Sequence, residues 1–117
     1  GYTNAPSILA GTGAGTGPTV SIKSGSTDLS GCIYVTTGTT CATSSTLATI
    51  TFVSTYSSAP KCVIISAANA ITMGAVAPRQ VNVDENTGIT TTTFVLTTGT
   101  TALTDATDYK WYYVVIQ

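Results

Sequence analysis

The sequence predicts an all-β protein, an antiparallel β-sandwich of about seven strands. Three observations lead to this prediction. Short runs that mix β-branched and small residues recur at close spacing, and turn residues separate them. No segment has the length and periodicity of an ordinary helix. About one residue in five is threonine, whose branched side chain stiffens an extended backbone while its hydroxyl can face water.

The first 18 residues are set apart by their composition. Residues 11–18 alternate glycine with small residues and end at Pro18, which is typical of flexible chain. We therefore expect a Gly-rich N-terminal arm over residues 1–18 and a single β-sandwich domain over residues 19–117. Contacts with a neighbouring subunit or with the rest of the chain would hold this arm in place.

The first three predicted strands follow the arm. Residues 19–23 alternate β-branched with polar or small residues and lead into a turn rich in Ser and Gly. Residues 32–37 form the next run, which ends at Gly38. Residues 47–53 alternate with a period of two, so Leu47 and Ile50 are predicted to point to opposite faces.

The second half of the domain is predicted to hold three further strands before the last. Residues 61–66 form an apolar run after Pro60. Residues 67–76 are expected to be an irregular excursion, because their alanines permit a short helix that Gly74 and Pro78 would cut short. Residues 80–84 and 91–97 are predicted strands, joined by a turn that contains Asn86 and Gly88.

The final segment, residues 109–117, is the most informative. It holds three of the six tyrosines and the single tryptophan, a composition typical of a strand. We expect Tyr109, Trp111 and Tyr113 to lie in the core or at an interface between subunits.

The charge content limits the classes of partner. Only 8% of residues are charged and the net charge is −1, against about 25% charged in ordinary soluble proteins. The cations Lys23, Lys61, Arg79 and Lys110 are scattered singly, which argues against nucleic acid because phosphate binding needs clustered Lys and Arg. No apolar run reaches about 18 residues, so no membrane span is predicted.

The residue types also argue against an enzyme. The chain has no histidine, so Ser–His and Cys–His nucleophile pairs cannot form. The glycines of residues 11–15 resemble a nucleotide loop, but Pro18 and the β-branched run after it exclude the helix that such a loop needs. Asp84 and Glu85 are adjacent, and they lack the spacing of a calcium loop. We expect no catalytic residues, no cofactor and no metal.

The cysteines leave alternatives open. Cys32 and Cys41 flank a turn-like segment and would close a hairpin by a disulfide; three free thiols are the alternative. Cys62 is predicted to pack on a buried strand as a small hydrophobic residue. The best candidates for binding a ligand, which stays unidentified, are polar loop residues of the kinds that bind sugars: Asn69, Arg79 and Asn86.

Several stretches together resemble a known family. They include GAGTGPTVSI at residues 13–22, APKCVIISAANA at 59–70 and YKWYYVV at 109–115. These resemble the small C-terminal β-sandwich domain at the ends of bacteriophage tail fibres and related virion appendages. The strand order also resembles the trimeric H-type lectin sandwich, but the histidine of that lectin's sugar site has no counterpart here, so its site cannot be carried over.

The resemblance implies a non-enzymatic virion protein at the particle surface. Such a domain would be a homotrimeric fibre tip that binds a host-surface glycan or protein, and its N-terminal arm would contact other virion proteins. A capsid fibre or decoration protein that braces the shell is the alternative, and a cellular lectin-like adhesin is a third. A disulfide between Cys32 and Cys41 would stabilise a particle outside cells.

Overall fold

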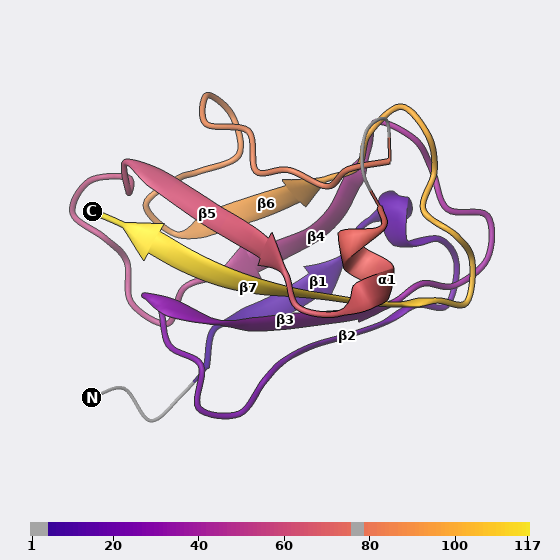
Figure 1. Ribbon diagram of the computed structural model, residues 1–117. Coiled ribbons are helices and arrows are strands. Elements are labelled where there is room, and N and C mark those ends of the chain that lie inside the picture. The colour runs from indigo at the N-terminus through magenta and orange to yellow at the C-terminus, as the bar shows by residue number, and fades with distance from the viewer. Residues whose placement is uncertain (1–4, 76–78) are drawn as a thin grey trace.

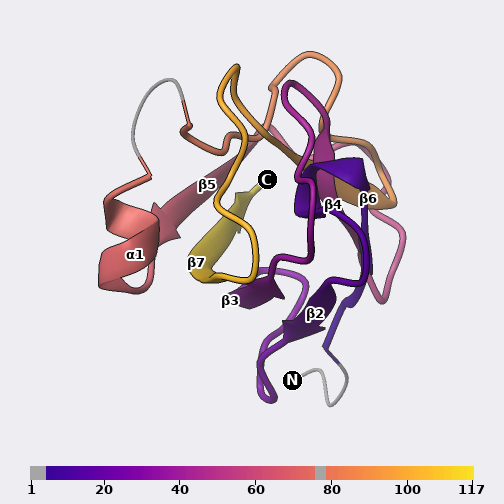
Figure 2. The ribbon, with the colours of Figure 1, turned by 90° about the vertical axis from the view of Figure 1, so that its right-hand side faces the viewer.

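The computed structural model describes residues 5–75 and 79–117. These residues form seven strands in two antiparallel sheets, together with one short helix and one 3-10 turn (Figure 1). Figure 2 shows the two layers from their ends, with β5, β7, β3 and β2 on one side and β4 and β6 on the other. The predicted all-β class and antiparallel sandwich are confirmed.

Each sheet brings together strands that are distant in sequence. The three-stranded sheet has the order β1 (Ser7–Ala10), β4 (Thr46–Thr51), β6 (Thr93–Thr97). The four-stranded sheet has the order β2 (Thr19–Ile22), β3 (Ser30–Thr36), β7 (Asp108–Ile116), β5 (Cys62–Ala67). The aromatic strand β7 therefore occupies a central position, with β3 and β5 on its two sides.

The core lies between the two sheets and is formed by alternate residues of the strands. The four-stranded sheet contributes Ile33, Trp111 and Tyr113, which are all buried. Ile33 and Trp111 are paired in register. The opposite sheet contributes Ile50 and Phe94, which are fully buried. The rings of Phe94 and Tyr113 meet across the layers with their centroids 5.4 Å apart, so aromatic contacts join the two sheets.

Six of the seven predicted strands are present, but residues 80–84 form no strand. Asn82 makes only an isolated bridge to Thr97. The chain then turns tightly, and the carbonyl of Gly88 accepts a hydrogen bond of 2.8 Å from the backbone N–H of Val95. This turn leads back to β6 and bonds to the edge of β6 that residues 83 and 84 would otherwise pair with. The pairing that starts at Asn82 therefore does not continue into residues 83 and 84.

One observed strand was not predicted. It is β1, which lies within the segment predicted to be the N-terminal arm. It pairs with β4, with Ile8 opposite Ile50. The glycine-rich stretch that follows contains a 3-10 turn, η1 (Thr12–Ala14), whose Ala14 is fully buried.

Close backbone contacts fix this glycine-rich stretch on the sandwich. The backbone N–H of Thr16 donates to Thr39 at 2.8 Å, and that of Gly38 donates to Ala14 at 2.8 Å. A Cβ at position 38 would collide with the carbonyl of Thr16, so only glycine permits this approach. Contacts within the chain therefore hold residues 11–16 in place.

Two local features differ from the simple alternating pattern. A four-residue helix, α1 (Ala70–Met73), forms in the predicted irregular excursion and ends at Gly74. Leu47 and Ala48 are consecutive and both fully buried, because the register shifts between Thr46 and Ala48 and η1 covers this end of β4. Among the described residues, no helix is long and apolar enough to cross a membrane.

Candidate functional site

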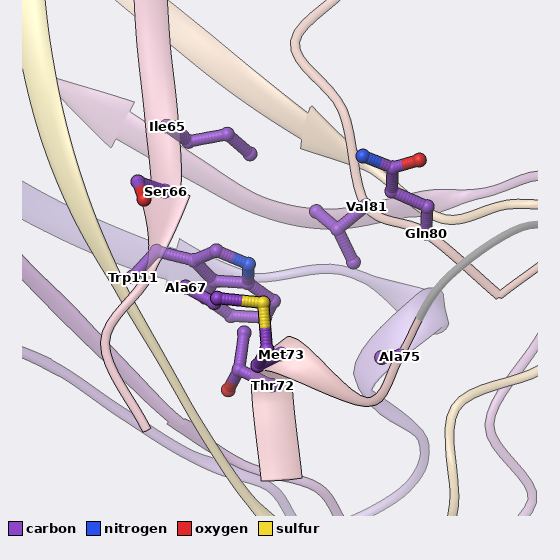
Figure 3. Close-up of a pocket in the computed structure, with 9 residues that line it drawn as sticks. All are labelled: Ile65, Ser66, Ala67, Thr72, Met73, Ala75, Gln80, Val81 and Trp111. Atoms are coloured by element: carbon purple, nitrogen blue, oxygen red, sulfur yellow. The ribbon is translucent and has the colours of Figure 1, made fainter. Parts of the chain in front are cut away.

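A pocket opens beside the aromatic strand where β5, α1 and residues 80–81 meet (Figure 3). Its volume is about 250 Å³. The described side chains around it carry no charge; they are Ile65, Ser66, Ala67, Thr72, Met73, Ala75, Gln80, Val81 and Trp111. The pocket therefore combines an apolar wall with a few neutral polar groups, which is typical of small-molecule sites.

The indole of Trp111 lies at the base of this pocket. The residue is only 4% exposed, and Figure 3 shows its ring nitrogen turned toward the space between Ile65 and Val81. No described residue accepts a hydrogen bond from this N–H. Because no side-chain nitrogen or oxygen that is shut off from solvent among the described residues lacks a partner, the indole N–H reaches accessible space, and Figure 3 shows the pocket on that side.

A second feature is the outer face of the four-stranded sheet. Alternation along β7 buries Tyr109, Trp111, Tyr113 and Val115 and turns the residues between them outward. We define the outer patch as the exposed large apolar side chains that β5 and β7 present on this face: Ile64, Tyr112, Val114 and Ile116. Ile64 and Tyr112 are 54% and 53% exposed, and Ile64 pairs in register with Val114, so the patch spans β5 and β7.

A third feature is the buried carboxylate of Asp28, which is 4% exposed. Its two oxygens accept hydrogen bonds from the backbone N–H groups of Val53 at 2.7 Å and Ser54 at 2.9 Å. The backbone carbonyl of Asp28 accepts from the hydroxyl of Tyr56 at 3.0 Å. These bonds join the β2–β3 connection to the segment after β4, so the role of Asp28 is structural.

Tyr113 lies in the core beside the β2–β3 connection that contains Asp28. Its hydroxyl donates to the carbonyl of Thr27 at 2.5 Å. Burial raises the pKa of this phenol well above its ordinary value, and the charge of Asp28 raises it further. The phenol therefore stays protonated beyond the pH at which a free tyrosine ionises.

The three predicted ligand residues are not gathered into one site. Asn69 caps α1, since its Oδ1 accepts from the N–H of Thr72 at 2.8 Å while its Nδ2 donates to the carbonyl of Asp108 at 3.2 Å. Arg79 donates from Nε to the carbonyl of Ala102 at 2.9 Å and lines a separate hollow beside α1. Asn86 lies exposed in the turn after Asp84 and lines neither hollow.

The cysteines are free thiols in this structure. The disulfide between Cys32 and Cys41 that the sequence permits is therefore not formed here. Cys41 lies near Asp105, whose carboxylate accepts from the backbone N–H groups of Thr40 at 3.1 Å and Cys41 at 3.3 Å. These bonds lower the pKa of Asp105, whereas burial and the neighbouring carboxylate raise the pKa of the Cys41 thiol.

The described residues bring no three His, Cys, Asp or Glu side chains together in a way that could hold a metal ion. Tyr109, Trp111 and Tyr113, predicted as core or interface residues, are buried within the single chain. The outer patch was not predicted, although the period of two in residues 109–117 already placed Tyr112 and Val114 opposite the buried aromatic residues.

No protein-family model, curated protein or solved structure matches the chain.

Proposed function

We propose that this chain is a non-enzymatic structural protein of a bacteriophage particle. In this proposal it forms the tip of a tail fibre, where three copies together attach to a glycan or protein of the host surface. The resemblance of its sequence to virion-appendage domains suggests the setting. The outer patch is the observation on which the assembly of copies depends.

The outer patch is suited to burial against another protein surface. Its members are large apolar side chains on β7 and on the edge strand β5, and two of them are more than half exposed. A contiguous exposed apolar patch on a soluble protein commonly marks an interaction site. β5, at the edge of the same sheet, carries no charged residue, so little opposes pairing along this edge.

A second copy of the chain is the partner that this face fits best. The charge on this part of the face is Lys110, and its ammonium lies 5.1 Å from the centroid of the Tyr34 ring of the same chain. Apart from this cation, the outer patch has no charge pattern that selects a different partner. Around a threefold axis the outer patches of three copies can meet one another, with Lys110 left at the rim. Three copies would also raise the strength of weak individual contacts with a host surface.

The mass of the protein in non-denaturing buffer tests the assembly. We expect light scattering to give three times the mass of one chain, and Val114→Lys to convert the protein to a monomer. Thr51→Lys is the matched control, because it places the same charge on an exposed position of β4. A stable monomer for the unaltered chain, or equal behaviour of the two variants, would contradict this assembly.

The location of the chain in a particle tests the biological role. Antibody labelling and electron microscopy of intact particles should place the chain at the fibre ends. Labelled protein should also adhere to host cells. Label distributed over tail-less heads would instead support a capsid decoration protein, and adhesion by a protein that no particle contains would support a cellular lectin-like adhesin.

A further inference from the structure

The Trp111 pocket is a cavity that the assembly of copies does not explain. It opens at the side of the sandwich beside α1 (Figure 3), whereas Tyr112 and Val114 of the outer patch do not line it. Its floor is a residue of the central strand. We therefore considered which chemical group would satisfy its walls.

The pocket offers a hydrogen-bond donor that has no acceptor among the described residues. This donor is the indole N–H of Trp111, which faces the cavity (Figure 3). Thr72 adds no second donor, because its Oγ1 is turned away from the cavity to accept from the backbone N–H of Lys110 at 2.7 Å, while its methyl group faces the indole. The site therefore calls for an acceptor oxygen.

The remaining walls select against charge. Ile65, Ala67 and Val81 form an apolar surface around the indole (Figure 3). The amide of Gln80 supplies a neutral acceptor and donor at the rim. A carboxylate or ammonium group would lose its hydration here without gaining a countercharge, which is unfavourable.

We propose that the Trp111 pocket binds the acetamido group of an N-acetylated sugar. Its carbonyl oxygen accepts from the indole N–H, its methyl group packs against the apolar wall, and its N–H faces the rim, where the side-chain amide of the exposed Gln80 lies. A sugar hydroxyl in the same place would leave the apolar wall unfilled. This inference rests on the proposed host-attachment role and names the ligand class for it.

The single tryptophan makes the pocket directly observable. A ¹⁵N-labelled sample has one indole N–H resonance, and it belongs to Trp111. We expect N-acetylglucosamine to shift this resonance in a saturable way, with a dissociation constant of roughly 1 mM for one weakly held group. Glucose carries a hydroxyl in place of the acetamido group, and we expect it to bind at least about tenfold more weakly.

Variants locate the binding. Ala67→Leu and Ala75→Leu fill the cavity from two different walls, so each should abolish the shift. The second keeps the test available if the first does not fold, which a ¹⁵N spectrum reveals. Asn82→Ala is the matched control, because Asn82 is exposed near Gln80 and does not line the pocket; it should bind as the unaltered chain does.

The outcomes separate this inference from the proposed function. No shift with N-acetylglucosamine, equal shifts with glucose, or unchanged binding by a folded filled variant would overturn the inference. The fibre role would stand in each case if the chain is trimeric and lies at fibre ends. Specific binding by a monomer that no particle contains would support the pocket and reject the fibre role.

Discussion

Replacing Asp28 with alanine should destabilise the fold far more than removing any exposed carboxylate. The side chain is buried and accepts two backbone N–H bonds, from Val53 and Ser54. A hydrogen bond to a charged acceptor contributes about 1.5–3 kcal/mol. Because the residues of both donors are exposed, water can replace part of each bond, and the lower value applies. We therefore expect a loss of about 3 kcal/mol for the two bonds.

Urea denaturation, followed by the fluorescence of Trp111, measures this loss. With a slope of about 1–3 kcal/mol per molar urea, the midpoint should fall by roughly 1–3 M at fixed protein concentration. Asp28→Asn should also destabilise the protein, because its amide group places a donor against one of the two N–H groups. Glu85→Ala removes the same charge from an exposed turn and should change stability by no more than about 0.5 kcal/mol.

A loss below about 1 kcal/mol for Asp28→Ala would refute this reasoning. It would mean that water satisfies both N–H groups once the carboxylate is gone. An equal loss for Glu85→Ala would also refute it, since the effect would then come from net charge and not from the buried bonds.

The remaining predictions concern the aromatic strand. Trp111→Ala should cost about 3–5 kcal/mol in the same urea assay, the usual cost of emptying a large buried site; a loss below about 1 kcal/mol would place the indole in solvent. Tyr113→Phe should flatten the loss of stability at alkaline pH. An unfolded tyrosine ionises near pH 10, while folded Tyr113 keeps its proton, so above about pH 10 the folded state binds more protons and stability falls by up to about 1.4 kcal/mol per pH unit. Parallel pH profiles for the variant and the unaltered chain would show that Tyr113 does not titrate in this way.

Much of the fold could be predicted because its strands follow the period of two. In residues 109–117 the aromatic residues at odd positions are buried and their neighbours are exposed. Core burial and side-chain alternation coincide in such a strand, and local sequence is then sufficient. The same holds for Ile50, which is buried and whose side chain was predicted to point to the face opposite that of Leu47.

The failures arise where distant segments decide the outcome. Leu47 is buried because η1 covers it and the register of β4 shifts, and neither feature is visible in residues 47–53. Val81 and Val83 have the composition of a strand, but the turn that ends at Gly88 occupies the edge of β6. β1 was missed because the glycines after it suggested a flexible arm.

The candidate site was harder to predict than the fold. The roles of Asn69 and Asp28 depend on backbone groups 39 and 25 or 26 residues away in sequence. The pocket depends on α1 and residues 80–81 meeting β5 beside Trp111. Sequence spacing carries no signal for such meetings, whereas the exposed partners of the aromatic residues on β7 could have been found from alternation alone.

The position of β1 has a consequence for the handling of this protein. β1 is the neighbour that closes one side of β4 in the three-stranded sheet. A protease that trimmed the first ten residues would uncover a row of main-chain N–H and C=O groups on β4, and open rows of this kind recruit other extended chains. We therefore expect clipping near the N-terminus to promote aggregation through the uncovered edge of β4.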